Sequence, residues 1–366
     1  MRSIKVNLDK KYSSSYEIRI GRGILDRIAL LIAKNHKAGR YVIITDDNVA
    51  RLHGGNFLAL LKNIGLAADL VDFPAGEGSK NIGTIIDLAD KLLKLGADRS
   101  TCLIALGGGV AGDMAGFIAS VYMRGVPYLQ IPTTLVAQVD SAIGGKTAID
   151  LTAGKNLLGT FYQPAAVFAD LNFLDTLPAK EFENGLAEII KYAIIDDEKM
   201  FVLLEENIEA VRQKESTLLI KIIENCCRIK KSIVEIDERE QGLRRILNYG
   251  HTLGHALEAV SAYKLTHGAG VALGMIAAAR ISFKMKYLHE GEAKRIEELI
   301  RLANLPTKIP ASLPTEEIIT RLQMDKKKRG DTIHFVLLKK IGMPFINGGV
   351  EKKLIGEVVE EMKNDA

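Results

Sequence analysis

The sequence predicts an α/β fold for the first half of the chain and a mainly helical fold for the second half. Up to about residue 170, short apolar runs typical of strands alternate with segments whose apolar residues follow the helical period. Beyond residue 178 the apolar spacing is helical almost throughout. Because strands that alternate with helices form parallel sheets covered by helices, we expect two domains, residues 1–178 and residues 179–366.

The first half is expected to contain strands and helices in regular alternation. Residues 4–8 and 16–20 alternate apolar and polar side chains as half-buried strands do, with a serine-rich turn at residues 13–15. The strands are expected at residues 4–8, 16–20, 41–45, 68–73, 101–106 and 166–170. The helices are expected to follow residues 21–23 and to cover residues 52–64, 81–95 and 114–122.

The second half carries helical patterns of different character. Its helices are expected at residues 181–195, 208–235, 271–283 and 351–362, of which the third is so rich in Ala and Gly that it should pack closely against its neighbours. Glu188 and Lys191 lie one turn apart on the first of them, a spacing that by itself fits a surface ion pair. The charged segment 325–330 fits a hairpin turn that leads into a strand at residues 332–338.

A glycine-rich turn follows the expected strand 101–106 directly. Gly107, Gly109 and Gly112 satisfy the spacing GxGxxG, so the backbone can approach a pyrophosphate at the start of the next helix. The acidic residue that usually follows about 20 residues later is absent. The pattern therefore fits either a variant cofactor fold or a plain glycine turn.

Polar side chains elsewhere in the first half also suit a ligand. Asp46 ends an expected strand, where it can accept hydrogen bonds from a ribose, and residues 76–80 form a second polar loop. Lys146, Lys155 and Asn156 lie in a Gly- and Thr-rich segment that we expect to form loops. They can bind a phosphate there, or they are solvated loop residues.

Three of the seven histidines lie within seventeen residues of each other. His251 and His255 are four residues apart, so on a helix their imidazoles share one face, about 6 Å apart at Cβ, and His267 follows. Such rings bind a divalent metal, bind an anion, or remain satisfied helix residues. Metalloprotease chemistry is not supported, because Thr252 occupies the position of the glutamate in HExxH.

The composition is that of a globular protein that handles small ligands. Apolar residues make up 47% and charged residues 26%, and the net charge of +4 is spread along the chain, which disfavours a nucleic-acid surface. Three cysteines without a CxxC pair suit a reducing compartment and exclude a thiolate zinc cluster. Apolar runs are shorter than the roughly 20 residues of a membrane span, and residues 1–25 lack the apolar block of a signal peptide. We expect a cytoplasmic protein that binds neither nucleic acid nor membrane.

Five motifs together resemble the 3-dehydroquinate synthase family of sugar-phosphate cyclases, and the likeness runs almost from end to end. The motifs are GGGVAGD at 107–113, IPTTLVAQVDSAIGGKT at 131–147, GLAEIIKY at 185–192, LNYGHTLGHA at 247–256 and DKK at 325–327. The resemblance implies a Rossmann-like N-terminal domain that binds NAD and a helical C-terminal domain that binds metal and substrate. It also implies a site in the cleft between the domains, and a homodimer.

The resemblance further implies roles for individual residues. The metal ligands, for Zn²⁺ or Co²⁺, are expected to be Glu188, His251 and His267, an oxygen and nitrogen set that zinc accepts. The expected NAD contacts are Asp46, Asn48, Glu77, Lys80, Gly108, Gly109, Val110, Asp113, Thr133, Thr134, Asp140, Lys146, Lys155, Phe173 and Thr176. The expected substrate contacts are Lys146, Lys155, Asn156, Lys191, Lys230, Arg244, Asn248, His255, one of Lys326, Lys327 and Lys328, and Arg124, which reaches across a dimer.

The reaction that the resemblance implies belongs to the shikimate pathway, which leads to chorismate and the aromatic amino acids. It converts 3-deoxy-D-arabino-heptulosonate 7-phosphate to 3-dehydroquinate and phosphate. The steps are transient oxidation by NAD, elimination of phosphate, reduction, and an intramolecular aldol closure, so there is no net redox change.

One departure from the family pattern concerns an expected metal ligand. The family motif HGEAVA reads HGAGVA at 267–272 here, so Ala269 replaces a glutamate, which can weaken the surroundings of the metal. A cyclase with another substrate, a polyol dehydrogenase of the glycerol dehydrogenase kind, and a silent ligand-binding paralogue are therefore alternatives. Lys230, Arg244 and Asn248 favour the carboxylate-bearing substrate, because a neutral hexose phosphate needs fewer such groups.

Overall fold

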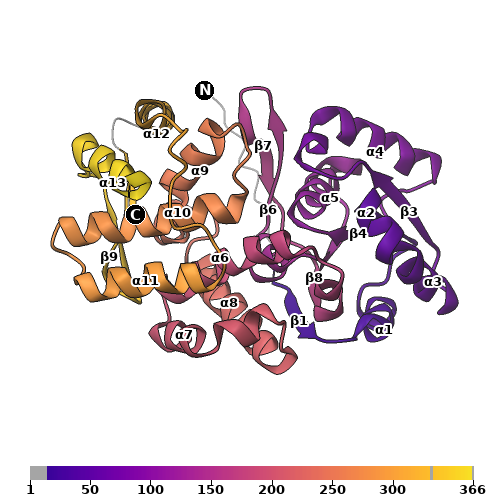
Figure 1. Ribbon diagram of the computed structural model, residues 1–366. Coiled ribbons are helices and arrows are strands. Elements are labelled where there is room, and N and C mark those ends of the chain that lie inside the picture. The colour runs from indigo at the N-terminus through magenta and orange to yellow at the C-terminus, as the bar shows by residue number, and fades with distance from the viewer. Residues whose placement is uncertain (1–14, 330–332, 365–366) are drawn as a thin grey trace, which may run out of the picture.

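The computed structural model describes residues 15–329 and 333–364, and side chains up to residue 323 and from residue 333 onward. Two halves lie side by side, with a β-hairpin standing between them (Figure 1). The N-terminal half is built on a six-stranded sheet, and the C-terminal half consists mainly of helices. The expected fold class is therefore confirmed, while the strand expected at residues 4–8 lies outside the described residues.

All strands of the main sheet run parallel, in the order β1-β8-β5-β4-β2-β3. They are β1 (Glu17–Gly21), β2 (Arg40–Asp46), β3 (Ala68–Phe73), β4 (Thr101–Gly107), β5 (Tyr128–Pro132) and β8 (Ala166–Asp170). On β2, Tyr41 and Ile43 belong to the core on one face, and Val42 and Ile44 to the core on the other. Because both faces are buried, this strand is apolar at consecutive positions.

Helices cover both faces of the sheet. Helices α4 and α5 share one core with the strands and α1 and α3 share the other, above and below the strands in Figure 1. Their bounds are α1 (Leu25–Asn35), α2 (Asp47–Val49), η1 (Ala50–Gly54), α3 (Gly55–Asn63), η2 (Glu77–Ser79), α4 (Ile82–Lys94) and α5 (Gly109–Val121). Helix α5 begins earlier than the expected residue 114, because the glycine-rich segment itself forms its first turn.

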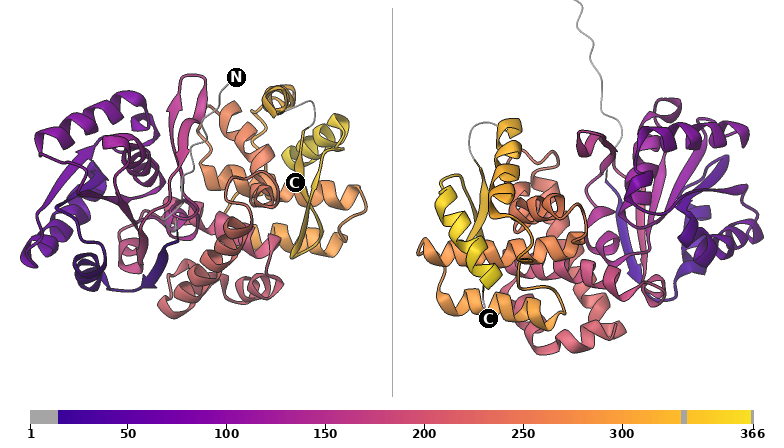
Figure 2. Two further views of the ribbon diagram at one scale, coloured as in Figure 1. Left: turned by 180° about the vertical axis from the view of Figure 1, so that it is seen from behind. Right: turned by 45° about the horizontal axis from the view of Figure 1, so that its top comes forward.

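Residues 146–161 correct the expectation of loops. They form an antiparallel hairpin of β6 (Lys146–Leu151) and β7 (Gly154–Phe161), which Figure 2 shows from two further sides. Lys146 therefore lies on β6, and Lys155 and Asn156 lie on β7. The glycines around the two strands give the segment the composition of a loop, although inner positions of β6 alternate between buried and half-buried.

Helix α10 lies at the centre of the second half, where it packs against α9, α6, α11, α13 and β9. The elements of this half are α6 (Ala179–Ile195), α7 (Glu198–Arg212), α8 (Ser216–Ile236), η6 (Leu243–Asn248), α9 (His251–Val260), α10 (His267–Lys284), α11 (Glu290–Leu302), α12 (Thr315–Arg329), β9 (Phe335–Lys340), β10 (Met343–Asn347) and α13 (Lys352–Asn364). The expected amphipathic stretch 208–235 is divided between α7 and α8. The chain turns at Lys214, which has a φ of 60°, and the Glu215 side chain then caps α8.

The hairpin turn expected at residues 325–330 is wrong. Helix α12 continues to Arg329, and strand β9 begins only at Phe335. A run of basic residues is favourable at the C-terminal end of a helix, where it faces the negative end of the helix dipole, so this charge pattern did not require a turn. Among the described residues, no helix combines the length and apolar character needed to cross a bilayer.

Candidate active site

Three side chains that begin or line separate helices converge in the second half. Glu188 lies on α6, His251 is the first residue of α9, and His267 is the first residue of α10. The Oε1 atom of Glu188 lies 2.9 Å from Nε2 of His267 and 3.4 Å from Nε2 of His251. Their ligand atoms all lie within 4.8 Å of one another. The structure thus brings together the three residues expected to hold a metal.

The chemistry of these residues fits a divalent cation. The Nδ1 atom of His251 lies 3.1 Å from the carbonyl oxygen of Tyr249, which can only accept a hydrogen bond. This contact favours the tautomer with the proton on Nδ1, whose Nε2 is free to bind a metal. Glu188 is fully buried. Burial would raise its pKa, but chiefly the charge of Lys191 holds the pKa of this carboxyl well below its usual range. A buried carboxylate beside two imidazoles is a donor set that zinc accepts.

A buried cluster of charges connects this site to the first half. Lys191 pairs with Glu188 and lies 3.6 Å from Oδ2 of Asp140, which belongs to η4 (Ala137–Ser141). Lys230 on α8 pairs with the Asp140 carboxylate and donates to its main-chain oxygen at 2.8 Å, and the Tyr192 hydroxyl donates to Oδ1 at 3.0 Å. Burial would raise the pKa of Asp140, but Lys230 and Lys191 hold it well below its usual range. Asp140 is therefore the ionised link between the halves.

His255 lies beside the three ligands but is not one of them. Its ring centroid is 5.3 Å from that of His251 and 6.1 Å from that of His267, and its side chain is exposed. Glu258, which the sequence analysis did not single out, forms a second group with His255 and His267. It follows His255 by three residues on the same helical face, so spacing alone could have indicated it.

The glycine turn lies where strands β4 and β2 end, at the point where the strand order of the sheet reverses. A Cβ on Gly108 would approach the Thr134 methyl group to 2.9 Å, so the close packing of the turn requires glycine. Asp46 lies beside Gly107, and its Oδ1 accepts a hydrogen bond from the Val49 amide at 3.0 Å. The other expected NAD contacts in this region are Gly109, Val110, Thr133 and Asn48. Open α/β sheets bind nucleotides at such a reversal.

A second group of expected contacts lies where the β6–β7 hairpin meets the polar segment after β3. Lys80 donates to Asp113 Oδ2 at 2.6 Å and to Asn156 Oδ1 at 2.5 Å. Lys155 lies 3.7 Å from Oε1 of Glu77 and 4.6 Å from the ring centroid of Tyr263, which follows α9. The hairpin therefore contacts both halves of the molecule.

A third group surrounds a carboxylate that the sequence analysis missed. Lys146 pairs with Glu240, and Asn248 donates to Glu240 Oε1 at 2.8 Å. Arg244 is buried nearby and donates to the carbonyl oxygens of Glu238 and, at 3.2 Å, Gly144. Burial would raise the pKa of Glu240, but Lys146 lowers it. Nothing in the spacing of Glu240 distinguishes it from the neighbouring acids.

The remaining expected residues lie apart from these groups. Phe173 packs edge-on against His53 at a centroid distance of 4.9 Å, and His53 Nε2 lies 2.8 Å from the Thr176 hydroxyl. His53 was not singled out by the sequence analysis. Arg124 has a φ of 69°, and its side chain makes no hydrogen bond or ion pair with the residues that the structure describes. The side chains of Lys326, Lys327 and Lys328 lie outside the described residues.

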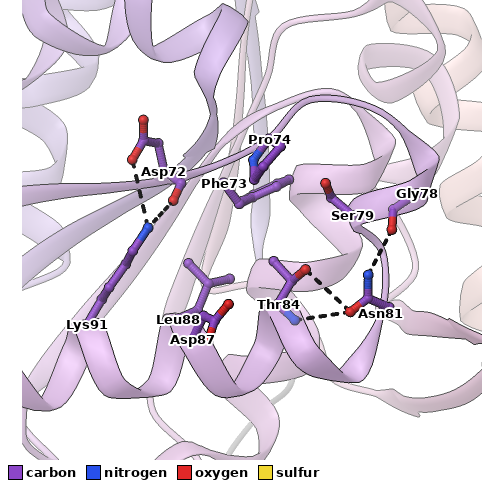
Figure 3. Close-up of a pocket in the computed structure, with 10 residues that line it drawn as sticks. All are labelled: Asp72, Phe73, Pro74, Gly78, Ser79, Asn81, Thr84, Asp87, Leu88 and Lys91. Atoms are coloured by element: carbon purple, nitrogen blue, oxygen red, sulfur yellow. Dashed lines mark hydrogen bonds and ion pairs between the residues drawn. The ribbon is translucent and has the colours of Figure 1, made fainter.

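A separate pocket of about 200 Å³ lies at the start of α4 (Figure 3). Its lining residues are Asp72, Phe73, Pro74, Gly78, Ser79, Asn81, Thr84, Asp87, Leu88 and Lys91. Asn81 bonds to Thr84 and Gly78, and Lys91 bonds to Asp72, so much of its polar lining is already paired within the pocket. None of the expected site residues line it.

Two solved structures are similar to this chain along nearly its whole length. A solved structure of ValA, a 2-epi-5-epi-valiolone synthase from Streptomyces hygroscopicus subsp. jinggangensis with NAD⁺ and Zn²⁺ bound, superimposes with a TM-score of 0.89 at 27% identity, covering 98% of this chain and 99% of that one. A 2-deoxy-scyllo-inosose synthase complexed with carbaglucose-6-phosphate, NAD⁺ and Co²⁺ gives a TM-score of 0.87 at 29% identity, covering 94% and 96%.

Sequence comparison is more specific. A 3-dehydroquinate synthase from Desulforamulus reducens is 44% identical over 343 residues, which cover 93% of this chain and 95% of the relative. Residues 70–184 match the family model described as 3-dehydroquinate synthase N-terminal, and residues 185–328 match the one described as 3-dehydroquinate synthase C-terminal. With both models matched in order and a relative of this identity along nearly the whole length, the chain belongs to the 3-dehydroquinate synthase family.

Proposed function

We propose that this protein is a 3-dehydroquinate synthase that converts 3-deoxy-D-arabino-heptulosonate 7-phosphate to 3-dehydroquinate and phosphate. The observation that carries the proposal is the convergence of Glu188, His251 and His267 beside the buried cations Lys191 and Lys230. A metal site flanked by cations suits a substrate that carries both hydroxyl and anionic groups. When bound, the metal acidifies a substrate hydroxyl and NAD accepts and returns a hydride.

Side chains of the second half and of the β6–β7 hairpin hold and orient the substrate in this proposal. We propose that Lys191 contacts the substrate oxygens, and in support its ammonium group lies beside Glu188, a proposed metal ligand. Lys146 and Asn248 bind an anionic end of the substrate, and in support both already contact one carboxylate, that of Glu240. The further substrate contacts that we propose are Lys155, Asn156, Lys230, Arg244 and His255.

NAD occupies the edge of the sheet at the glycine turn in this proposal. The N-terminal end of α5 faces the pyrophosphate with free amide groups, and Asp46 holds a ribose. Lys80 and Asp113, which bond to each other, complete the nucleotide side. The further contacts that we propose are Asn48, Glu77, Gly108, Gly109, Val110, Thr133, Thr134, Asp140, Lys146, Lys155, Phe173 and Thr176.

We also propose that the protein is a homodimer in the cytoplasm, with an NAD-binding domain of residues 1–178 and a metal- and substrate-binding domain of residues 179–366. Large apolar side chains are exposed on β7 and at the end of α5. The two elements adjoin, because the Thr160 hydroxyl of β7 donates a hydrogen bond to the Ser120 hydroxyl of α5 at 3.0 Å. They are Leu157, Leu158, Phe161 and Val121. Arg124 follows this apolar surface in the sequence. If a second copy of the chain covers the surface, Arg124 of one copy comes close to the active site of the other.

One incubation tests the function against its alternatives. The protein is mixed with the heptulosonate phosphate and NAD, while inorganic phosphate and the absorbance of reduced nicotinamide are recorded. We expect phosphate release without net reduction of NAD. Net NADH would indicate a polyol dehydrogenase, release only from another sugar phosphate would indicate a different cyclase, and NAD binding without any release would indicate a silent paralogue.

A further inference from the structure

The imidazole of His267 lies between two buried carboxylates, one facing each ring nitrogen. Its Nε2 is 2.9 Å from Oε1 of Glu188, and its Nδ1 is 3.2 Å from Oε1 of Glu258. Glu258 lies on α9, opposite the start of α10, and is 5% exposed. The ring is therefore oriented by a contact outside the three-ligand cluster.

The position of Glu258 depends on a glycine of the facing helix. A Cβ on Gly270 would lie 3.0 Å from Cγ and 3.3 Å from Oε1 of Glu258. These distances are tighter than ordinary van der Waals contact, so a side chain at position 270 would displace the carboxylate. Gly270 therefore packs against the carboxylate that faces Nδ1 of His267.

We propose that Glu258 is the positioning residue that presents His267 to the metal, and that Gly270 provides the space for it. This inference rests on the metal site of the proposed function. When Glu258 accepts a hydrogen bond from Nδ1–H, the lone pair of Nε2 is left for the metal and the ring becomes a better ligand. His251 receives the corresponding contact from the main-chain oxygen of Tyr249.

The test measures zinc affinity separately from activity. Metal-free wild type, Glu258→Gln and Glu258→Ala are titrated with zinc against a fluorescent chelator, with NAD affinity and thermal unfolding measured beside them. We expect zinc to bind about 10-fold more weakly in E258Q, which keeps an acceptor oxygen, and up to about 100-fold more weakly in E258A, with unchanged NAD affinity. Wild-type zinc affinity in both variants overturns the proposal.

A double-mutant cycle tests the role of Gly270. Gly270→Ala should weaken zinc binding more in the wild type than in E258A, where there is no carboxylate to displace and only the contact with the Gly254 oxygen remains. Thermal stability should fall in both backgrounds, because the new Cβ also lies 3.0 Å from the Gly254 oxygen. Equal losses of zinc affinity in the two backgrounds would contradict the coupling.

The outcome is separable from the fate of the proposed function. His251→Ala removes a proposed ligand itself, so it must lose zinc if the metal site is correct. If H251A keeps its zinc, the metal site and the proposed function are wrong. If H251A loses zinc while both Glu258 variants bind zinc normally, only the role of Glu258 is wrong.

Discussion

Replacing Asp140 by asparagine tests whether one buried carboxylate joins the two halves of the molecule. Asp140 lies on η4, pairs with Lys230 of α8, and is 3.6 Å from Lys191 of α6. The two lysine side chains are only 7% and 1% exposed. Asparagine keeps the shape and an acceptor oxygen, but it leaves Lys230 as a buried cation without an anion.

The expected cost follows from that missing charge. Removing one partner of a buried ion pair costs about 3–5 kcal/mol, and the remaining amide oxygen places Asp140→Asn near the low end, at about 3 kcal/mol of the free energy of unfolding. Glu235→Gln is the matched control. Glu235 pairs at 2.7 Å with Lys231, which follows Lys230 on α8, and both side chains are more than half exposed. Breaking such a surface pair costs less than about 0.5 kcal/mol.

The assay is urea unfolding at neutral pH, followed by circular dichroism, with metal removed from every variant so that zinc binding does not contribute. Adding Lys230→Met to D140N should restore part of the loss, because it removes the unpaired cation. The pKa of Asp140 is lower in the folded state than in the unfolded state. Its contribution to the free energy of unfolding is therefore fully present above the unfolded-state pKa and disappears as the pH falls through the folded-state pKa. The difference between wild type and D140N should shrink in acid. If D140N unfolds at the same urea concentration as E235Q, the reasoning is wrong.

Three further predictions concern the metal, the nucleotide and the helix packing. His251→Ala should abolish phosphate release and lower the zinc measured by elemental analysis; full activity with unchanged zinc refutes the ligand assignment. Lys80→Met should weaken NAD binding about tenfold by calorimetry, because Lys80 is 4% exposed and bonded on the nucleotide side, whereas an exposed lysine of α4 should be neutral. Gly274→Ala should lower the free energy of unfolding by more than about 2 kcal/mol, since its Cβ would lie 1.8 Å from the Gly250 oxygen. Gly55→Ala, where the Cβ meets nothing within 4 Å, should be neutral or stabilise by up to about 1 kcal/mol, and equal effects would contradict the packing argument.

The fold class was predictable because it depends on local patterns. Consecutive apolar residues such as those from Tyr41 to Ile44 identify a strand buried on both faces, and helical spacing identifies the second half. The β6–β7 hairpin was not predictable in this way, because flanking glycines obscure strands whose outer positions are exposed. The lysines at the end of α12 were misread for a similar reason, since charge suits a turn and a helix end equally well.

The site was less accessible from the sequence, because its contacts join residues far apart in the chain. The conspicuous pair His251 and His255 shares a helix face, yet the group that converges on Glu188 takes His267 from another helix. Glu240 escaped notice because an acid beside a cation becomes visible only after the helices have packed, whereas Glu258 could have been noticed from its helical spacing to His255. Resemblance to the family supplied the expected ligands, and spacing alone would have left the alternatives open.

The distance between the two histidines depends on residues that have no side chain. His251 and His267 each begin a helix, and α9 and α10 cross at glycines. A Cβ on Gly254 would lie 2.8 Å from the Gly270 oxygen, so even alanine would push the helices apart. Because each ligand begins its helix, that displacement would also separate the two imidazoles, whose ring centroids are now 5.3 Å apart. The geometry of the proposed metal site is therefore determined by backbone contact between helices, which a pattern of histidines and acids cannot reveal.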